Sequence, residues 1–379
     1  MKYLAILGRQ PEISIAELEA QLGGSCRLLS FPQTDGIFGG PPPQPSPAYV
    51  RFSSPSAAIL ARLGGTLKLA VELEERPIEF LQKLPEGKIT IGVSDYSKRA
   101  SRKTATLEAL KLKKILVRHG RSVRVVENKE AVLSTATSLH NGLSGKNERK
   151  VELIKVDDDW YRVIGVQDID AYAKRDQMRP ARDAKVGMLP PKLAQILINL
   201  CGPLPEDSTI LDPFCGTGVV LQEALLMGYR AYGTDINERM IEYSEKNLKH
   251  FNFENYKLEC GDATEHKWSE KINAVACEGY LGKPMSQIPS EIKLKTEKQG
   301  CSGIILGFLK NLAEQVRAET PVVIAVPAWL RENGEYSRLE ILDEIESLGY
   351  NVNNKSREGL LYHREGQIVA RDIIILRKK

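Results

Sequence analysis

The sequence predicts an α/β protein in two parts, an α+β region followed by a domain built on a parallel sheet. Three observations support this prediction. A strand-like run enters a glycine-containing turn at residues 211–218, two later strand-like runs end at an acidic residue, and the charge changes sign between the two parts of the chain. With 379 residues the chain exceeds one typical domain, so we expect two or three.

The turn at residues 211–218 reads L-D-P-F-C-G-T-G and precedes a helix-like run, residues 219–227. Gly216 and Gly218 lack a Cβ, so the backbone can come close to a ligand there. The first N–H groups of the following helix are free to bind a carboxylate or a phosphate. About 20 residues further on, Asp235 ends the next strand-like run, where an acidic side chain can accept hydrogen bonds from both hydroxyls of a ribose. We therefore expect a cofactor that contains a nucleoside.

Two common types of nucleotide site do not match this turn. An NAD site carries G-x-G-x-x-G, but no glycine follows Gly218 at the required spacing, and the Gly-Lys-Ser/Thr ending of a P-loop is absent. The turn instead resembles the D-P-F-C-G-T-G turn of S-adenosyl-L-methionine (SAM) methyltransferases that act on exocyclic amines of nucleobases. Another kind of nucleotide-binding Rossmann domain is the alternative.

The resemblance implies a role for each strand end. The glycine turn with Asp212 would face the methionine end of SAM, Asp235 would hold the ribose, and Asp262, which follows a third strand-like run, would accept a hydrogen bond from the adenine amino group. The predicted cofactor-binding residues are Asp212, Phe214, Cys215, Gly216, Gly218, Asp235, Ile236, Asp262, Ala263 and Met188.

The charge distribution suggests a polyanionic partner. Residues 88–150 contain 15 Lys and Arg against 5 Asp and Glu, whereas residues 201–350 contain 15 Lys and Arg against 24 Asp and Glu. A basic region that precedes an acidic catalytic region suggests that the basic region binds a nucleic acid and the acidic region modifies it. A solvated basic surface is the alternative.

Cysteine usage and the first residues suggest a cytoplasmic protein. The six cysteines are scattered without a C-x-x-C pair, so we expect neither disulfides nor a bound metal. The apolar run at residues 1–7 is too short for a signal peptide or a membrane span, and charged residues follow it. We expect no membrane association.

Residues 1–85 are predicted to form a ferredoxin-like α+β subdomain. Residues 3–7 read as a buried strand, and Ser14 with Glu17 reads as a capping box that opens a helix over residues 15–22. The later runs read as a loop, a strand and a helix over residues 35–47, 48–52 and 55–63.

Residues 86–168 are predicted to form an RNA-binding domain. Its runs read as a helix over residues 104–119 with Leu107, Leu110, Ile115 and Leu116 as its apolar side, and as strands over residues 88–93, 122–126, 132–139, 151–156 and 160–166. This pattern resembles a THUMP domain, an RNA-binding module of tRNA-modifying enzymes. Residues expected to contact RNA are Lys98, Arg99, Arg102, Lys103, Lys113 and Lys114.

Residues 169–187 are charged and lack a hydrophobic period, so they read as a linker before a domain at residues 188–379. The entry G-M-L-P-P-K-L-A at residues 187–194 resembles that of THUMP-containing tRNA guanine-N2 methyltransferases, which methylate guanine at tRNA position 10. The likeness covers nearly the whole chain, up to a closing hairpin over residues 360–376. It implies a Rossmann-like sheet of seven strands, SAM as the cofactor and tRNA as the partner.

The chain departs from this family where the fourth strand ends. Amino-methyltransferases carry Asp/Asn-Pro-Pro-Tyr/Phe there, whose acceptors hold the amine in line with the methyl group and whose aromatic ring stacks on a base taken out of its helix. Here the residues are Cys277, Glu278, Gly279 and Tyr280. We expect Tyr280 to stack and Glu278 to serve as the acceptor, since a carboxylate can accept from N1–H and N2–H of guanine together. Cys277 as a covalent nucleophile is a weaker alternative.

The sequence therefore predicts SAM-dependent methyl transfer to the N2 amine of a guanine in tRNA. The alternatives are an amino-methyltransferase for another RNA or DNA base, and a non-catalytic RNA-binding relative with a degenerate motif at residues 277–280. We expect a monomer, with a partner subunit left open.

Overall fold

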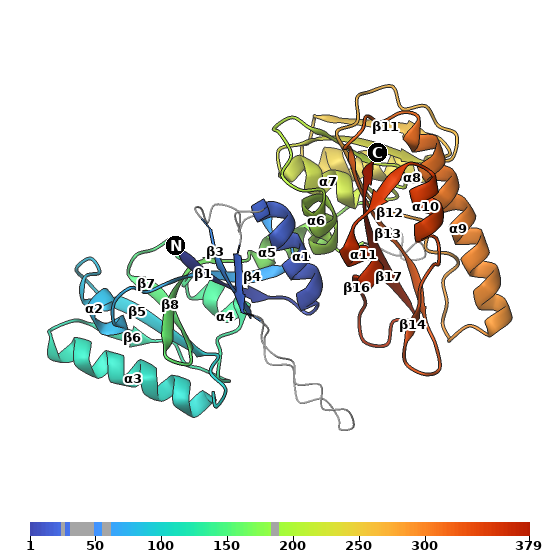
Figure 1. Ribbon diagram of the computed structural model, residues 1–379. Helices are drawn as coiled ribbons and strands as arrows, with labels where there is room; N and C mark the ends of the chain where they lie inside the picture. Colours follow the sequence, from blue (N-terminus) through green and yellow to red (C-terminus); the bar gives the residue numbers. More distant parts are fainter. Residues whose placement is uncertain (24–26, 31–48, 55–61, 183–188) are drawn as a thin grey trace. The chain divides into compact units, whose positions relative to one another are not determined.

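The computed structural model describes residues 1–23, 27–30, 49–54, 62–182 and 189–379. They form two compact units, one from residues 1–15 and 22–171 and the other from residues 16–21 and 172–379. Each unit is built around its own sheet (Figure 1). The loop predicted at 35–47, most of the helix predicted at 55–63, and Met188 lie outside the described residues.

The sheet of the first unit has eight strands in the order β2-β3-β1-β4-β8-β7-β5-β6. β5 is parallel to β6 and β7, and the other neighbours are antiparallel. Strands from both predicted regions, 1–85 and 86–168, belong to this one sheet, because β4 pairs with β8; the division at residue 85 stays a prediction. The elements are β1 Lys2–Leu7, α1 Pro11–Leu22, β2 Arg27–Ser30, β3 Tyr49–Ser53, β4 Thr66–Glu72, α2 Pro77–Gln82, β5 Ile89–Asp95, α3 Arg102–Arg118, β6 Val123–Val125, α4 Thr135–His140, β7 Lys150–Val156 and β8 Asp159–Val166.

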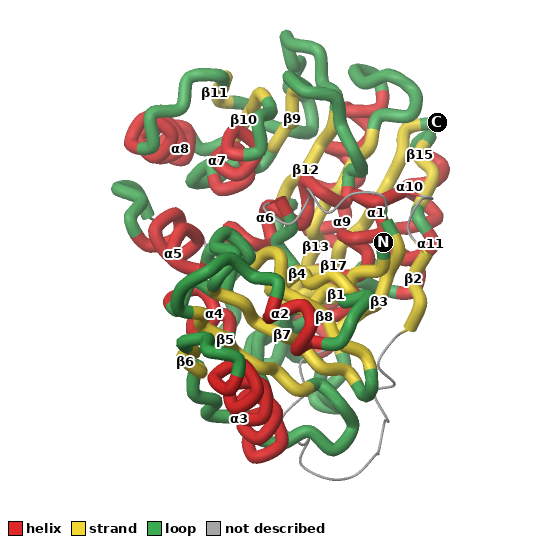
Figure 2. Tube along the Cα trace, turned by 90° about the vertical axis from the view of Figure 1, so that its left-hand side faces the viewer, coloured by secondary structure: helices red, strands yellow, loops and turns green. Residues whose placement is uncertain are grey.

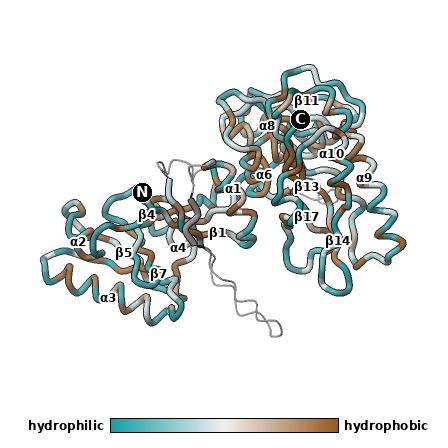
Figure 3. The backbone as a smooth tube through the Cα atoms, in the orientation of Figure 1, coloured by the Kyte–Doolittle hydropathy of each residue, from teal (hydrophilic) through white to brown (hydrophobic). Residues whose placement is uncertain are grey.

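The core face of α3 differs from the predicted one. Leu107, Leu110 and Ile115 are 47%, 48% and 37% exposed, and only Leu116 of the predicted apolar face is buried. The helix instead buries Ala105, Ala109, Leu112 and Leu116, whose spacing of three to four residues forms one continuous stripe. Small alanines let the helix pack against β5. Leu107 and Leu110 are therefore left exposed, on a helix along which hydrophobic and hydrophilic residues alternate (Figure 3).

Two further local predictions in this unit are wrong, and one is confirmed. The first helix begins at Pro11, a favoured first position, and the hydroxyl of Ser14 inside it bonds the carbonyls of Gln10 and Gly65 instead of capping it. Residues 132–139 form no strand, because α4 starts at Thr135 with Ser134 as its N-cap. The strands predicted over residues 151–156 and 160–166 are confirmed as β7 and β8, which pair antiparallel.

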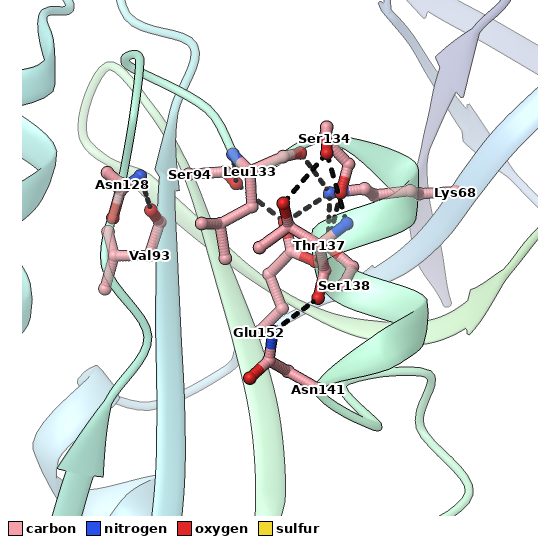
Figure 4. Close-up of polar contacts among 10 residues, drawn as sticks. All are labelled: Lys68, Val93, Ser94, Asn128, Leu133, Ser134, Thr137, Ser138, Asn141 and Glu152. Atoms are coloured by element: carbon pink, nitrogen blue, oxygen red, sulfur yellow. Dashed lines mark hydrogen bonds and ion pairs between the residues drawn. The ribbon is translucent and has the colours of Figure 1, made fainter.

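A buried ion pair joins α4 to the sheet of the first unit (Figure 4). Lys68 Nζ lies 2.6 Å from Glu152 Oε1, and the two side chains are 2% and 0% exposed. Lys68 also donates to the carbonyl of Leu133, and the hydroxyls of Ser94 and Ser138 donate to Glu152. Since every contact is short and directed, this network fixes the segment before α4 on β4, β5 and β7.

The second unit contains the predicted Rossmann-like sheet. Seven strands follow the order β11-β10-β9-β12-β13-β17-β15, and the short strands β14 and β16 pair at its side. β17 is antiparallel to both neighbours, whereas the first five strands are parallel. The elements are α5 Ile169–Gln177, α6 Pro191–Leu200, β9 Thr209–Asp212, α7 Val219–Leu226, β10 Arg230–Asp235, α8 Glu238–His250, β11 Tyr256–Cys260, β12 Ala274–Glu278, α9 Glu291–Ala313, β13 Pro321–Leu330, β14 Tyr336–Ser337, α10 Leu342–Ser347, β15 Tyr350–Val352, α11 Asn354–Glu358, β16 Leu361–Tyr362 and β17 Val369–Lys378.

Helices cover both faces of this sheet. The crossovers through α7 and α8 run from β9 outward and those through α9 and α10 run the other way, so right-handed connections place the two pairs on opposite faces (Figure 2). α9 packs Ile305, Phe308 and Leu309 into the core. The residues predicted as a linker include α5, which buries Tyr172; a linker can be helical, so that assignment stays a prediction. No helix among the described residues is both long and apolar enough to cross a membrane.

Candidate functional site

A cavity of about 590 Å³ opens at the carboxyl ends of strands β9 to β12 in the second unit. This is the edge at which open parallel sheets bind ligands, and the volume is typical of a cofactor site. Its lining comes from residues 212–217, 235–237, 262–264 and 278–284, with apolar side chains from Leu189, Val219, Val220, Met240 and Ile304.

The glycine turn between β9 and α7 gives the cavity a wall of backbone. Gly216 and Gly218 have φ of 50° and 81°, which favours glycine at both positions. A Cβ on Gly216 would meet only the Phe214 carbonyl oxygen at 3.9 Å, so this side is open to a ligand. A Cβ on Gly218 would lie 2.9 Å from Ser244 Oγ, and Gly218 does not line the cavity. Gly218 therefore lets α7 start against α8.

Asp235 ends β10 and ties the glycine turn to this strand. Its Oδ2 accepts a hydrogen bond from the Gly216 N–H and its Oδ1 one from the Asn237 N–H, both at 2.9 Å. Burial raises the pKa of Asp235, although the two N–H donors act in the opposite direction. The carboxylate is thus fixed in orientation with lone pairs left for ligand hydroxyls.

Asp262 follows β11 and is oriented by Thr264. Its Oδ1 accepts from the Thr264 N–H and from the Thr264 hydroxyl, both at 2.8 Å. No hydrogen bond to Oδ2 is present among the described residues, so that oxygen is available to a donor in the cavity. Ala263 beside it is buried and forms part of the same wall.

The cavity is acidic. Four carboxylates line it, those of Asp212, Asp235, Asp262 and Glu278, against one ammonium group, that of Lys283. Asp212 is 2% exposed, and burial raises the pKa of its carboxyl well above the usual range, with the charges of Asp235 and Glu278 adding to the shift. Such a lining favours a ligand that carries positive charge.

Consecutive residues at the end of β12 point to opposite sides of the sheet. Glu278 lines the cavity, and its carboxylate forms an ion pair with the guanidinium of Arg371 on β17. Cys277 is fully buried in the hydrophobic core, and burial raises the pKa of its thiol well above the usual range. The structure therefore does not bring Cys277 to the cavity, and a thiolate nucleophile at this position has no support.

The motif residues after Glu278 continue the wall of the cavity. The Gly279 N–H donates to the Ala325 carbonyl at 2.9 Å, a bond that a proline at this position could not make. Tyr280 lines the cavity and is 40% exposed, so part of its side chain is accessible to a ligand. The absence of both prolines thus coincides with one more residue of pairing between β12 and β13.

An arginine-rich segment before the sheet supports the glycine turn from below. Arg179 is 3% exposed and donates to the Thr217 hydroxyl at 3.1 Å, and Arg175 pairs with the buried Glu223 of α7 at 2.8 Å. The segment is charged and has no hydrophobic periodicity, so its sequence predicts a linker and does not indicate the contact with the glycine turn.

Most predicted cofactor residues meet in this cavity. The structure places there Asp212, Phe214, Cys215, Gly216, Asp235, Ile236, Asp262 and Ala263. Asn237 and Thr264 were missed, although each stands two residues after a predicted acidic residue and could have been found from that spacing. The loop 281–284 and Ile304 carry no local signal.

The residues predicted to contact RNA lie on the surface of the first unit. Lys98 and Arg99 precede α3, Arg102 and Lys103 lie in its first turn, and Lys113 and Lys114 lie further along it. Arg102 pairs with Glu127 at 3.0 Å on an exposed surface, a contact that contributes little energy. The cluster formed by residues 98–103 is thus open to phosphates.

Comparisons with known proteins point to methyltransferases. A family model described as a methyltransferase domain matches residues 204–339, and one described as a DNA methylase matches residues 125–246. A probable tRNA (guanine(10)-N2)-dimethyltransferase of Methanothermococcus thermolithotrophicus is 32% identical over 139 residues, which are 35% of this chain and 78% of that protein.

Two further relatives with the name tRNA (guanine(10)-N2)-dimethyltransferase match shorter shares of their length. The one from Methanothermobacter thermautotrophicus is 42% identical over 25% of this chain and 28% of that protein, and the one from Methanocaldococcus jannaschii is 27% identical over 48% and 53%. The chain thus matches between about a quarter and a half of their length. The crystal structure of TrmN from Thermus thermophilus superposes with a TM-score of 0.50 over 100% of both chains at 15% identity, which shows the fold.

Proposed function

The chain belongs to the tRNA (guanine(10)-N2)-dimethyltransferase family, and we propose that it transfers methyl groups from SAM to the N2 amine of a guanine in tRNA, at position 10. The observation that carries the proposal is the acidic cavity in which the glycine turn, Glu278 and Tyr280 meet. The relatives named above have this activity in their names.

The residues of the cavity fit SAM. SAM has a sulfonium and an ammonium group, and the lining offers four carboxylates to them and to the ribose and adenine. Asp235 would accept from the ribose hydroxyls, and Asp262 Oδ2 from the adenine amino group. The glycine turn with Asp212 would hold the methionine end. When bound, SAM supplies an electrophilic methyl group.

Glu278 and Tyr280 would act on the guanine. The N2 amine is a poor nucleophile because its lone pair is delocalised into the ring. Glu278 accepts from N1–H and N2–H, which holds the nitrogen in place and offsets the positive charge that develops on it. Tyr280 stacks on the base once the base has left its helix. The positioning of the amine by these two groups accounts for much of the expected acceleration.

The first unit would bind the body of the tRNA. Residues 98–103 and the outward face of α3 present unburied Lys and Arg, which give affinity for phosphates without reading sequence. We propose that residues 86–168 act as a THUMP-type RNA-binding domain and residues 188–379 as the methyltransferase domain. We also propose that the protein acts on tRNA as a monomer in the cytoplasm.

Labelled SAM with bulk tRNA, followed by nucleoside analysis, tests the proposal. N2-methylguanosine or N2,N2-dimethylguanosine supports it and shows how many methyl groups are added. Another methylated amine makes the chain an amino-methyltransferase for a different base. No label in the RNA, with RNA binding intact, makes it a non-catalytic relative.

A further inference from the structure

Arg371 lies next to the proposed base site, and nothing in the sequence pattern marked it. It stands on β17 opposite Pro327 of β13, while Glu278 at the end of β12 stands opposite Ala325 of β13. The Arg371 Nε donates to Glu278 Oε1 across β13, at the same edge of the sheet as the cavity. The two side chains are 7% and 18% exposed, so both are largely shielded from water.

The guanidinium has donors that no group of the described residues uses. Among the described residues, Nε has a hydrogen-bond partner, whereas Nη1 and Nη2 have none. Neither of these two nitrogens belongs to the fully buried polar atoms of the described residues that are without a partner, so neither is fully buried. Both nitrogens are therefore partly accessible, on a side chain that does not itself line the cavity but pairs with Glu278, which does. Guanidinium donors in such a shielded place normally find an acceptor, which points to a ligand.

The pair matches one edge of one nucleobase. Guanine presents N2–H, N1–H and the acceptor O6 in a row, and enzymes read a base outside its stack by this edge. If the carboxylate of Glu278 takes the two N–H donors, the next group along the edge is O6, which requires a donor. Adenine presents an amino group at that place, which a guanidinium would oppose.

We propose that Arg371 is a specificity-determining residue that donates from its terminal nitrogens to O6 of the target guanine, while its Nε holds Glu278 in orientation. The inference rests on the proposed function and names how that site selects its base. A role limited to holding Glu278 would lower the rate equally for guanine and for an analogue that keeps N1–H and N2–H and differs only at O6. A role in reading O6 changes the ratio of the two rates.

The test uses tRNA ligated from synthetic pieces with guanine or 6-thioguanine at the target nucleotide. Sulfur in place of O6 is a weak acceptor, while N1–H and N2–H remain. We expect kcat/KM of the wild-type chain to fall about 10- to 100-fold with 6-thioguanine. Arg371→Met should be slower with guanine but should distinguish the two bases by less than about threefold, within the scatter of such factors. Arg371→Lys, which keeps a donor, should retain part of the difference.

Arg377→Met is the matched control. Arg377 stands on the same strand and the same face, six residues along, opposite Pro321 at the far edge of the sheet from the cavity. It should leave both rates and their ratio unchanged. Melting temperature and SAM binding show that each variant is folded.

The inference is overturned if Arg371→Met has the same ratio of kcat/KM between guanine and 6-thioguanine as the wild-type chain. It is also overturned if the wild-type chain methylates both bases equally well. In either case the proposed function stands, because methyl transfer to guanine is still observed. A wild-type chain that transfers no methyl group to the guanine tRNA contradicts the proposed function itself.

Discussion

Glu278→Gln should abolish most of the methyl transfer while leaving the fold intact. The substitution replaces a charged acceptor by a neutral one of the same shape, so the developing charge on the amine loses its partner. Loss of one such electrostatic group costs about 2.7–4 kcal/mol in the transition state, or about 100- to 1000-fold in kcat. The cost in stability is smaller, because the Gln oxygen can still accept from Arg371 Nε. Both side chains are more than four-fifths buried, so we expect the free energy of unfolding to fall by about 1–2 kcal/mol. This lies between the loss of a surface ion pair and the loss of a buried one.

Single-turnover methyl transfer at saturating SAM and tRNA measures this rate, and thermal unfolding measures the stability. Glu259→Gln is the control, because Glu259 also stands near the end of a strand and pairs with Lys257 at 3.0 Å, but does not line the cavity. It should retain its rate within about twofold, the usual scatter of independent sites. A Glu278→Gln chain with a near-normal rate would remove Glu278 from the mechanism and leave the acceptor of the amine unassigned.

Four other perturbations test the cofactor site, the RNA-binding surface and the buried ion pair of the first unit. Asp235→Asn should weaken SAM binding by calorimetry about 10- to 100-fold, because a charged acceptor for the ribose and for the Gly216 N–H is lost. SAM affinity should rise as the pH rises through the raised pKa of Asp212, because the cationic groups of SAM favour the ionised carboxylate. The free energy of unfolding of the ligand-free chain should fall as the pH rises from the ordinary pKa of Asp to this raised pKa, because the folded carboxyl holds its proton more tightly than the unfolded one. Replacing Lys98, Arg99 and Lys103 together by Ala should weaken tRNA binding and reduce the slope of log K against log salt by about 2–3, if each contacts one phosphate. Lys68→Met should destabilise the first unit by about 3–5 kcal/mol in denaturant unfolding, because Glu152 is left buried without its partner, and Lys68→Met with Glu152→Gln should recover part of the loss.

Each of these has an outcome that counts against it. Unchanged SAM affinity in Asp235→Asn would show that Asp235 does not bind the ribose. An Asp212→Asn chain with the wild-type pH profile would show that Asp212 is not the group that causes the pH dependence. An unchanged salt slope would place the tRNA on another surface; Lys83→Ala, at a lysine paired with Glu75, is the control for lost charge. A Lys68→Met chain of normal stability would show that the buried network contributes nothing to the first unit.

The cofactor side of the cavity could be predicted because its signals are local. A strand, a turn and a helix follow one another at the glycine turn, and parallel strands bring their carboxyl ends to one edge, so Asp212, Asp235 and Asp262 had to lie near one another. The alternation of side chains along a strand could also have placed Cys277 in the core once Glu278 faced the cavity. Arg371 stands 93 residues after Glu278, and no local pattern joins the two.

The fold of the first unit was harder to predict, because short elements depend on their surroundings. In α3 the bulky residues Leu107 and Leu110 suggested the buried face, but the close approach to the sheet selects Ala105 and Ala109 instead. The β-branched residues at 132–139 suggested a strand, whereas the Ser134 cap and the Lys68 network hold a helical turn there. Residue propensity is a weak guide where tertiary contacts decide.

A defined tRNA transcript, incubated with methyl-labelled SAM and mapped by mass spectrometry of its nuclease fragments, tests the central claim most directly. We expect label on N2 of guanine in the fragment that contains nucleotide 10, and none when that nucleotide is adenine. Label at another nucleotide, or on an atom other than an exocyclic amine, would show that this chain is not a methyltransferase for N2 of guanine 10.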